Sequence, residues 1–372
     1  NGIVGNRAES VRILGEDSIL VLITAEIDRQ TQNDPLLIEQ FLEIETAETF
    51  QEVPIHAWGR NAILLRDRVI RQDEIWTNEQ PYILLNTLII DSLQTLTIQE
   101  GVEIYSYPNA FVVVAGRLNI EGSFENPVLL TGVRQEEIYR DAAGQWGGIV
   151  TAVGSQPSHI RNARIRNALW GVRAGTPDND TIADVRIEHT VIENMADAGI
   201  LAFGSDIEMK NSLINNCLNQ TFAGLAGGTY KLDHVTLANF SFDFIRQDPS
   251  ILFTDLFETG GVRFEEDLFV EVRNSILWGA LEEEIFISDE GVGTTTLSIA
   301  NSILRTEQIE TFDLNDNLLN VDPKFEAAFL YNYSLDTLSP AQDQGLQLNF
   351  PLDLLGNPRD EFPDIGAYEF QD

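Results

Sequence analysis

A short motif recurs at nearly constant spacing through the middle of this chain, and it constrains the fold more than any other feature. An aliphatic residue, any residue and then asparagine recur at spacings of 27, 22 and 23 residues, ending at Asn167, Asn194, Asn216 and Asn239. Residues 274–277 and 301–304 repeat the strand that precedes Asn216 almost letter for letter, without the asparagine. A period in the low twenties, built from short strands without an amphipathic helix, is typical of one coil of a parallel β-helix.

The four asparagines fall at one position of the repeat. In stacked coils each residue lies about one strand spacing from its equivalent in the next coil. Side-chain amides at one position can then pass hydrogen bonds along the stack. We predict that Asn167, Asn194, Asn216 and Asn239 form a structural ladder. A sugar site lined by the same asparagines is the alternative.

Strand-like segments of the same character precede the motif. Residues 93–98 alternate between apolar and polar side chains, and short apolar segments follow at 101–105, 111–114, 116–122, 126–131 and 146–149. Residues 133–145 between them are expected to form a surface loop. We therefore predict an all-β chain whose main domain, residues 66–320, is a right-handed parallel β-helix.

The first 65 residues have a different pattern. Residues 18–27, 36–44 and 53–59 predict three consecutive strands with polar connections, as in an antiparallel sandwich. Three strands are too few to close a sandwich. We therefore expect residues 1–65 to be the C-terminal part of one, completed by upstream residues or by another chain.

Residues 321–372 are rich in proline and aspartate and carry no repeat. A β-helix has an open end, which exposes apolar core and unpaired strand edges. We predict that this irregular segment folds over that end as a cap.

The same segment carries a recognisable motif. Its residues are Gly356, Asn357, Pro358 and Arg359, followed by Asp364, Gly366, Tyr368 and Glu369. They resemble the C-terminal choice-of-anchor motif of right-handed parallel β-helix proteins that are abundant in the Bacteroidetes. Residues 57–59 resemble the last strand of an immunoglobulin-like domain that precedes such helices. The resemblance implies an outer-membrane surface lipoprotein, anchored through a lipid attached upstream.

Charge and cysteine content exclude several other classes of protein. The chain has 59 acidic and 23 basic residues, a net charge of −36. Nucleic acids and anionic lipid surfaces need a basic stripe, so neither is expected as a partner. Cys217 is the single cysteine, so an intramolecular disulfide is impossible. No apolar run approaches the ~20 residues of a membrane span.

Catalytic motifs of known β-helix enzymes were sought and not found. There is no Asp-Asp pair, and His56, His159, His189 and His234 do not lie between glycines. His189 and His234 occupy equivalent coil positions, which favours a turn role. Residues 178–180 and 313–317 are rich in oxygen ligands but lack calcium-loop spacing. We predict no catalytic residue, no cofactor and no metal ligand, with calcium as the alternative.

One long interruption of the repeat is the candidate interaction loop. It combines acidic, basic and aromatic side chains: Asp243, Arg246, Asp248, Phe253, Asp255, Phe257 and Arg263. We expect these residues to contact a partner or a glycan.

Together these features predict a non-enzymatic scaffold on the extracellular side of the outer membrane. Its predicted partner is an outer-membrane complex for barrel assembly, secretion or nutrient import, of which this chain would be an accessory lipoprotein subunit. The alternatives are a carbohydrate-binding or polysaccharide-cleaving β-helix protein and an adhesin.

Overall fold

The computed structural model covers all 372 residues and describes residues 5–24, 36–175, 182–240, 244–308 and 316–371. The chain forms two compact units, residues 1–61 and 62–372, and each is described by itself.

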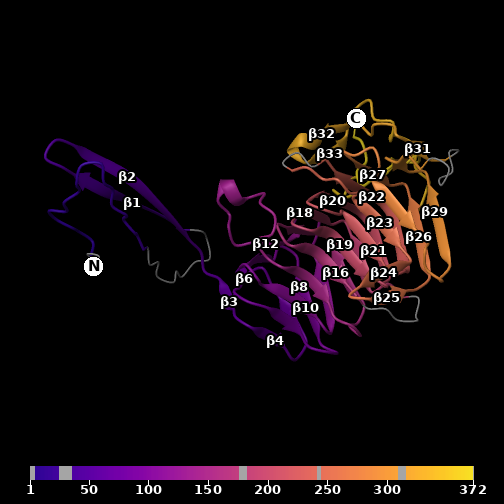
Figure 1. The fold of residues 1–372 in the computed structure, drawn as a ribbon, viewed down its shortest axis with the longest axis horizontal. Helices are drawn as coiled ribbons and strands as arrows, with labels where there is room; N and C mark the ends of the chain where they lie inside the picture. The colour runs from indigo at the N-terminus through magenta and orange to yellow at the C-terminus, as the bar shows by residue number, and fades with distance from the viewer. Residues whose placement is uncertain (1–4, 25–35, 176–181, 241–243, 309–315, 372) are drawn as a thin grey trace. The chain divides into compact units, whose positions relative to one another are not determined.

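The second unit is a parallel β-helix (Figure 1). The chain winds repeatedly through three sheets, named here faces A, B and C, and each strand pairs in parallel with its equivalent in the next coil. Face A contains β4 (Arg68–Ile70), β7 (Leu88–Ile90), β10 (Phe111–Val114), β13 (Gly148–Thr151), β16 (Trp170–Ala174), β19 (Ala198–Phe203), β21 (Phe222–Leu225), β23 (Ile251–Thr254) and β28 (Ile285–Ser288).

Faces B and C share two long strands that bend around their common corner, β20 (Ile207–Cys217) and β22 (Gly228–Asn239). The other strands of face B are β5 (Glu74–Trp76), β8 (Thr95–Gln99), β11 (Arg117–Glu121), β14 (Ser158–Arg161), β17 (Val185–Glu188), β26 (Leu268–Arg273) and β29 (Thr295–Ala300). The other strands of face C are β3 (Ile63–Leu65), β6 (Tyr82–Leu84), β9 (Glu103–Ser106), β12 (Val128–Gly132), β15 (Ala163–Arg166), β18 (Val191–Met195), β27 (Ile276–Gly279), β30 (Ile303–Leu304) and β31 (Leu318–Leu319).

Stacked aliphatic side chains form the core. On face C one inward position is aliphatic in eight successive coils, and all eight residues are fully buried: Ile104, Leu130, Ile165, Ile192, Ile214, Leu237, Leu277 and Leu304. Four of them are the aliphatic residues of the sequence motif. Alternate residues of a strand point to opposite faces, so residues two positions apart point the same way. In the motif the aliphatic residue occupies a core position, and the asparagine two residues later occupies the corner that follows. The predicted parallel β-helix is confirmed.

From the coil that contains β14 to the coil that contains β29, the corner between faces B and C turns through one left-handed residue per coil. These residues have φ between 43° and 51° and form a column, called here the B–C column: Asn162, His189, Asn211, His234, Asn274 and Asn301. Asparagine tolerates this conformation better than most residues because its short polar side chain bonds locally. The histidines that the sequence placed at equivalent turns therefore belong to an asparagine column.

The C-terminal segment lies along the side of the helix, against the outer surface of face C, and not over its end. It contains β32 (Phe325–Ala327) and β33 (Asn332–Leu335). The backbone carbonyl of Asp353 is hydrogen-bonded to the ring of His189, and the backbone carbonyl of Gln344 accepts a hydrogen bond from the side chain of Asn301. His189 and Asn301 are several coils apart. Core residues of the last coils, such as Leu297 and Leu319, remain only partly buried.

The physical reason for this lateral path is the composition of face C. Its outward residues Leu213, Ala238 and Ile276 are apolar and pack beneath Leu354, Ala367 and Ile365 of the segment. Burial of such side chains favours folding by about 25 cal/mol per Å² of apolar surface. A long apolar face therefore attracts the segment more strongly than the smaller open end.

The first unit contains one antiparallel pair, β1 (Leu36–Glu45) and β2 (Phe50–Gly59). The expected strand at 18–27 is wrong over residues 18–24, which form no strand, and residues 25–27 lie outside the described residues. An immunoglobulin-like sandwich stays a prediction. Among the residues described in either unit, no helix is long and apolar enough to cross a membrane.

Candidate binding surface

The outer surface of face A carries a row of mostly apolar side chains. Parallel pairing aligns one outward residue from each strand, and we name this set the face A row: Val69, Ile89, Val113, Val150, Arg173, Leu201, Ala223, Leu252 and Phe286. Eight of the nine are apolar. Ala223 is buried, Phe286 is 42 % exposed, and the other seven are half-buried. At about 4.8 Å between strands, the row is about 38 Å long.

Aromatic side chains flank the middle of this row. The Phe111 and Trp170 rings lie 6.3 Å apart, and the Phe203 and Phe257 rings 5.2 Å apart. The guanidinium of Arg173 lies over Trp170 at 5.5 Å and over Phe203 at 5.3 Å. Cation–π contacts of this kind hold the one charged member of the row flat against the surface.

Face B has the opposite character. One outward position alternates in charge through six coils, in the order Glu121, Arg161, Glu188, Lys210, Asp233 and Arg273. Arg273 pairs with Asp233 at 2.7 Å, and His159 with Glu188 at 3.3 Å. Opposite charges on neighbouring strands suit a solvated sheet. The C-terminal segment covers face C from β18 to β30, whereas Leu64 on the first strand of that face is exposed. Face A carries the longest of the aligned apolar rows that the segment leaves uncovered.

Three of the six described members of the candidate interaction loop are buried, and contact of the loop with a partner stays a prediction. Phe253 and Asp255 are fully buried because Phe253 lies within β23, where the chain re-enters the helix, and Asp255 directly follows that strand. Arg246 is also buried, and its guanidinium pairs with the carboxylate of Glu284 at 2.6 Å. That pair anchors the loop to the carbonyl of Asn239. These side chains hold the coil together and are closed to a partner.

Other members of the loop remain accessible. Phe257 lies on the hairpin of β24 (Leu256–Thr259) and β25 (Val262–Glu265) and joins the surface of face A through Phe203. Arg263 on the same hairpin pairs with Glu265 at 2.8 Å in solvent. Asp248 is exposed, and Asp243 lies outside the described residues.

The predicted asparagines lie at one corner, between faces C and A. Asn194 donates to the Oδ1 of Asn167 at 3.2 Å, and Asn216 donates to the Oδ1 of Asn194. Asn239 departs from this chain of bonds and instead accepts from the backbone nitrogen of Cys217 and donates to its carbonyl. All four are used internally.

The C-terminal motif ties the segment to the B–C column. Arg359 pairs with Glu369 at 2.9 Å and donates to the carbonyl of Gly366 and to Asn211. Gly366, with φ of 106°, approaches Ile276 so closely that a Cβ would lie 2.8 Å from its side chain. Sequence analysis missed Asp353, whose carboxylate accepts bonds from the backbone of residues 355, 357 and 369. An Asx turn before Gly356 was its only sequence signal.

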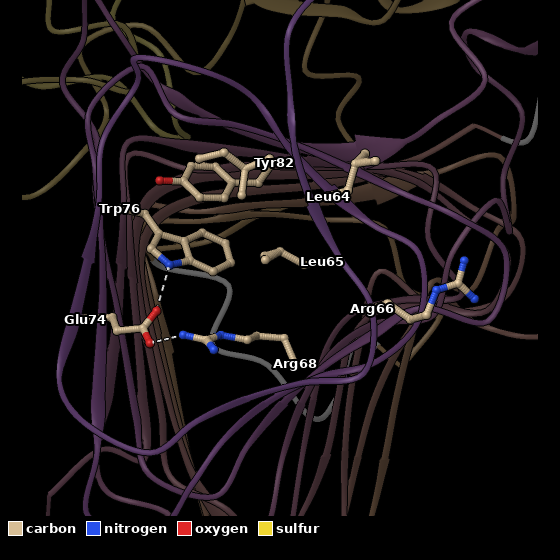
Figure 2. A pocket seen from close by; sticks show the side chains of 8 residues that line it. Leu64, Leu65, Arg66, Arg68, Glu74, Trp76 and Tyr82 are labelled. Atoms are coloured by element: carbon tan, nitrogen blue, oxygen red, sulfur yellow. Dashed lines mark hydrogen bonds and ion pairs between the residues drawn. The ribbon is translucent and has the colours of Figure 1, made fainter. Parts of the chain in front are cut away.

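A pocket of about 490 Å³ opens at the first coil and is shown in Figure 2. Trp76 and Tyr82 stack in its wall with ring centroids 4.2 Å apart. Glu74 accepts bonds from Arg68 and from the indole of Trp76. Its lining residues belong to the first coil, except Tyr82, which lies on β6 of the second coil. We therefore interpret this pocket as a feature of the first turns of the β-helix and not as the binding site.

The described residues contain no group of three or more His, Cys, Asp or Glu side chains that could hold a metal ion. Residues 178–180, the first calcium candidate, lie outside that set. Within the second candidate, Asn317 is described and bonds the backbone of Ser302 and Ile299 as a corner residue.

Comparison with known proteins agrees with this architecture. Residues 68–203 match the family model described as a pectate-lyase-like beta helix domain. The match supports the parallel β-helix seen in the structure. The match covers the strands from β4 to β19, and so includes Trp170 and Arg173. Proteins with this fold include enzymes and non-enzymes, so the match leaves catalysis open. A search of curated proteins found no match.

Proposed function

We propose that this protein is a non-enzymatic cell-surface scaffold whose β-helix binds a protein partner through the face A row. The observation that carries this proposal is the row itself, eight apolar residues among nine outward positions on nine adjacent strands. The largest apolar patch on the surface of a soluble protein is often a binding site. On face B, built from the same coils, one outward position is charged in six coils, from Glu121 to Arg273.

A standard protein interface buries about 800 Å² on each partner. The row alone is about 38 Å long. The flanking rings of Phe111, Trp170, Phe203 and Phe257 enlarge it with side chains that are enriched at interfaces.

The cellular setting is part of the same proposal. The C-terminal motif from Gly356 to Glu369 resembles that of surface lipoproteins, and its residues tie the segment to the helix. We place the protein on the extracellular side of the outer membrane, held by a lipid anchor, as an accessory subunit of a complex for barrel assembly, secretion or nutrient import. An adhesin would use the same surface on a partner outside the cell.

The test is mild detergent extraction of the native protein, followed by affinity purification and mass spectrometry. A stoichiometric partner is expected with the wild type and is expected to be lost with Leu201→Asp/Leu252→Asp. Thr97→Asp/Ser298→Asp is the matched control, because it adds the same charge to outward positions of face B. Retention of the partner by the face A variant, or a wild-type protein that purifies alone, would overturn the proposal.

Glycan binding is the second candidate, and a separate observation favours it. The indole nitrogen of Trp170 donates to Asp197 at 2.7 Å, and the side-chain amide of Asn219 donates to the same carboxylate at 2.7 Å. An aromatic ring beside a fixed carboxylate and amide can stack on a sugar and bond its hydroxyls. Glycan-array binding that disappears in Trp170→Ala would support it.

A further inference from the structure

The corner between faces A and B carries carboxylates in several coils. Four aspartates each accept a hydrogen bond from a backbone N–H of the next coil, at 2.7–3.0 Å, and we name them the acidic edge: Asp73, Asp184, Asp206 and Asp267. These bonds orient the carboxylates at the corner. The acidic edge therefore runs beside the face A row.

Further acids concentrate negative charge near β19 and β23. Glu266, Asp289 and Glu290 are exposed around the same corner. Burial, and then the charges of Asp206 and Asp267, raise the pKa of Glu266, which reports the local excess of negative charge. The base on the neighbouring hairpin, Arg263, is engaged by Glu265.

The edge and the row are close enough to engage one ligand. Asp206 follows the last residue of β19, Phe203, by three positions, and Leu201 of the row lies on the same strand. An extended chain advances about 3.3 Å per residue, so Leu201 and Asp206 are separated by at most about 17 Å. One partner segment can therefore cover the apolar row and meet the carboxylates with its own edge.

We propose that the partner segment on face A is an amphipathic stretch of protein whose apolar side chains cover the row and whose lysines or arginines meet Asp206, Glu266 and Asp267. This inference rests on the proposed function and adds the chemistry of the partner. Charge complementarity carries it, because an apolar surface bordered by carboxylates favours a bordering cation. A second copy of this chain is disfavoured, since each copy carries a net charge of −36.

The test uses two acetylated, amidated peptides of about 12 residues, a length that spans the row when extended. One alternates leucine with lysine and the other alternates leucine with serine. Binding to the full chain is measured by titration calorimetry at about 0.02 M and about 0.3 M salt. The wild type should bind the lysine peptide about tenfold more tightly at low salt, and this advantage should shrink at high salt.

Three variants separate the two contributions. Asp206→Asn/Glu266→Gln/Asp267→Asn keeps the Oδ1 acceptors that cap the next coil and should abolish the lysine advantage. Leu201→Asp/Leu252→Asp should weaken binding of both peptides. Glu43→Gln/Glu45→Gln/Glu48→Gln makes the same charge change in the first unit, at exposed positions, and should leave binding unchanged.

The other possible results of the peptide titrations contradict the inference in different ways. Equal affinity for both peptides would remove the acidic edge from recognition and leave the row as a binding surface. Lysine-peptide binding that survives in the row variant would mean general attraction to an acidic protein and would overturn the inference. Binding of neither peptide would also overturn it. The proposed function is tested independently, by the purification experiment with Leu201→Asp/Leu252→Asp.

Discussion

Arg359 and Asn211, 148 positions apart in the chain, are joined by a hydrogen bond of 3.1 Å from the guanidinium Nη2 to the side-chain Oδ1. Arg359 also pairs with Glu369, and both side chains are nearly inaccessible, 2 % and 4 % exposed. One buried ion pair thus connects the C-terminal segment to itself and to the B–C column.

Replacing Arg359 should therefore loosen the segment. Arg359→Met leaves the Glu369 carboxylate buried without its partner, a loss of about 3–5 kcal/mol in comparable pairs. We expect faster hydrogen exchange and proteolysis across residues 321–371. Arg263→Met is the control, because its exposed pair with Glu265 contributes about 0–1 kcal/mol. Unchanged exchange in Arg359→Met would show that apolar packing alone holds the segment.

The lateral path of that segment marks the limit of what the sequence could predict. The coil itself was predictable, because the aliphatic residue and the asparagine lie close together in the sequence and recur once in each coil. The destination of residues 321–372 depended on an apolar face assembled from Leu213, Ala238 and Ile276, which come from three different coils. Such a face exists only after the coils are stacked.

The same reasoning explains why the sequence did not predict the face A row and why Phe253 of the interaction loop is buried. Loops of unequal length separate members of the face A row, so Val113, Val150 and Arg173 have no common spacing in the sequence. The interaction loop was predicted from its residue types. Burial, however, depends on the register of the strand, and in β23 the side chain of Phe253 points into the core. Residue types alone do not reveal which side of a strand faces inward.

The asparagine ladder should be sensitive to both bonding and backbone conformation. Asn194 has φ of 61° and bonds Asn167 and Asn216. Asn194→Gly keeps the left-handed turn and loses the bonds, at about 1–3 kcal/mol for each buried partner left unpaired. Asn194→Ala adds about 1–2 kcal/mol for the left-handed conformation. Denaturant unfolding of both variants is the measurement, and equal stability of Ala and Gly would contradict the backbone contribution.

The stability of the protein should fall on acidification through His234. Burial, reinforced by the positive charge of Arg359, holds the pKa of His234 well below its usual range. The unfolded chain therefore binds a proton below about pH 6.5 that the folded chain rejects, so the unfolding free energy decreases as the pH falls. Between about pH 7 and about pH 5 the loss is at most about 2 kcal/mol.

His234→Asn isolates this effect, because asparagine occupies the equivalent position in Asn211 and Asn274. The variant should lose less stability than the wild type over the same pH range. Burial raises the pKa of Asp364 to about 6 and so has the opposite pH dependence, but it is present in both proteins and cancels in the difference. Identical pH dependence of the two proteins would exclude His234 as the group responsible.

Cys217 should be unreactive until its coil opens. The thiol is fully buried, and burial raises its pKa to about 12, so the reactive thiolate is scarce at neutral pH. We expect no reaction with an aromatic disulfide reagent in the native protein and complete reaction in denaturant. Because Cys217 is the only cysteine, the signal reports one site. Rapid native labelling would mean that the coil opens locally.

The buried pair of Arg246 and Glu284 should show strong coupling. Their side chains are 3 % and 0 % exposed, and Glu284 also accepts backbone bonds from Ser250 and Leu281. Arg246→Met alone leaves a buried, uncompensated carboxylate and should cost about 3–5 kcal/mol.

Adding Glu284→Gln to Arg246→Met removes that charge and keeps one oxygen for the backbone donors, so the double variant should be more stable than Arg246→Met. A double-mutant cycle of unfolding free energies measures the coupling, for which about 1–3 kcal/mol is expected. Additive losses would contradict it. Coupling of that size would mean that the pair, rather than either charge, fixes the loop that follows Asn239, where the asparagine ladder ends.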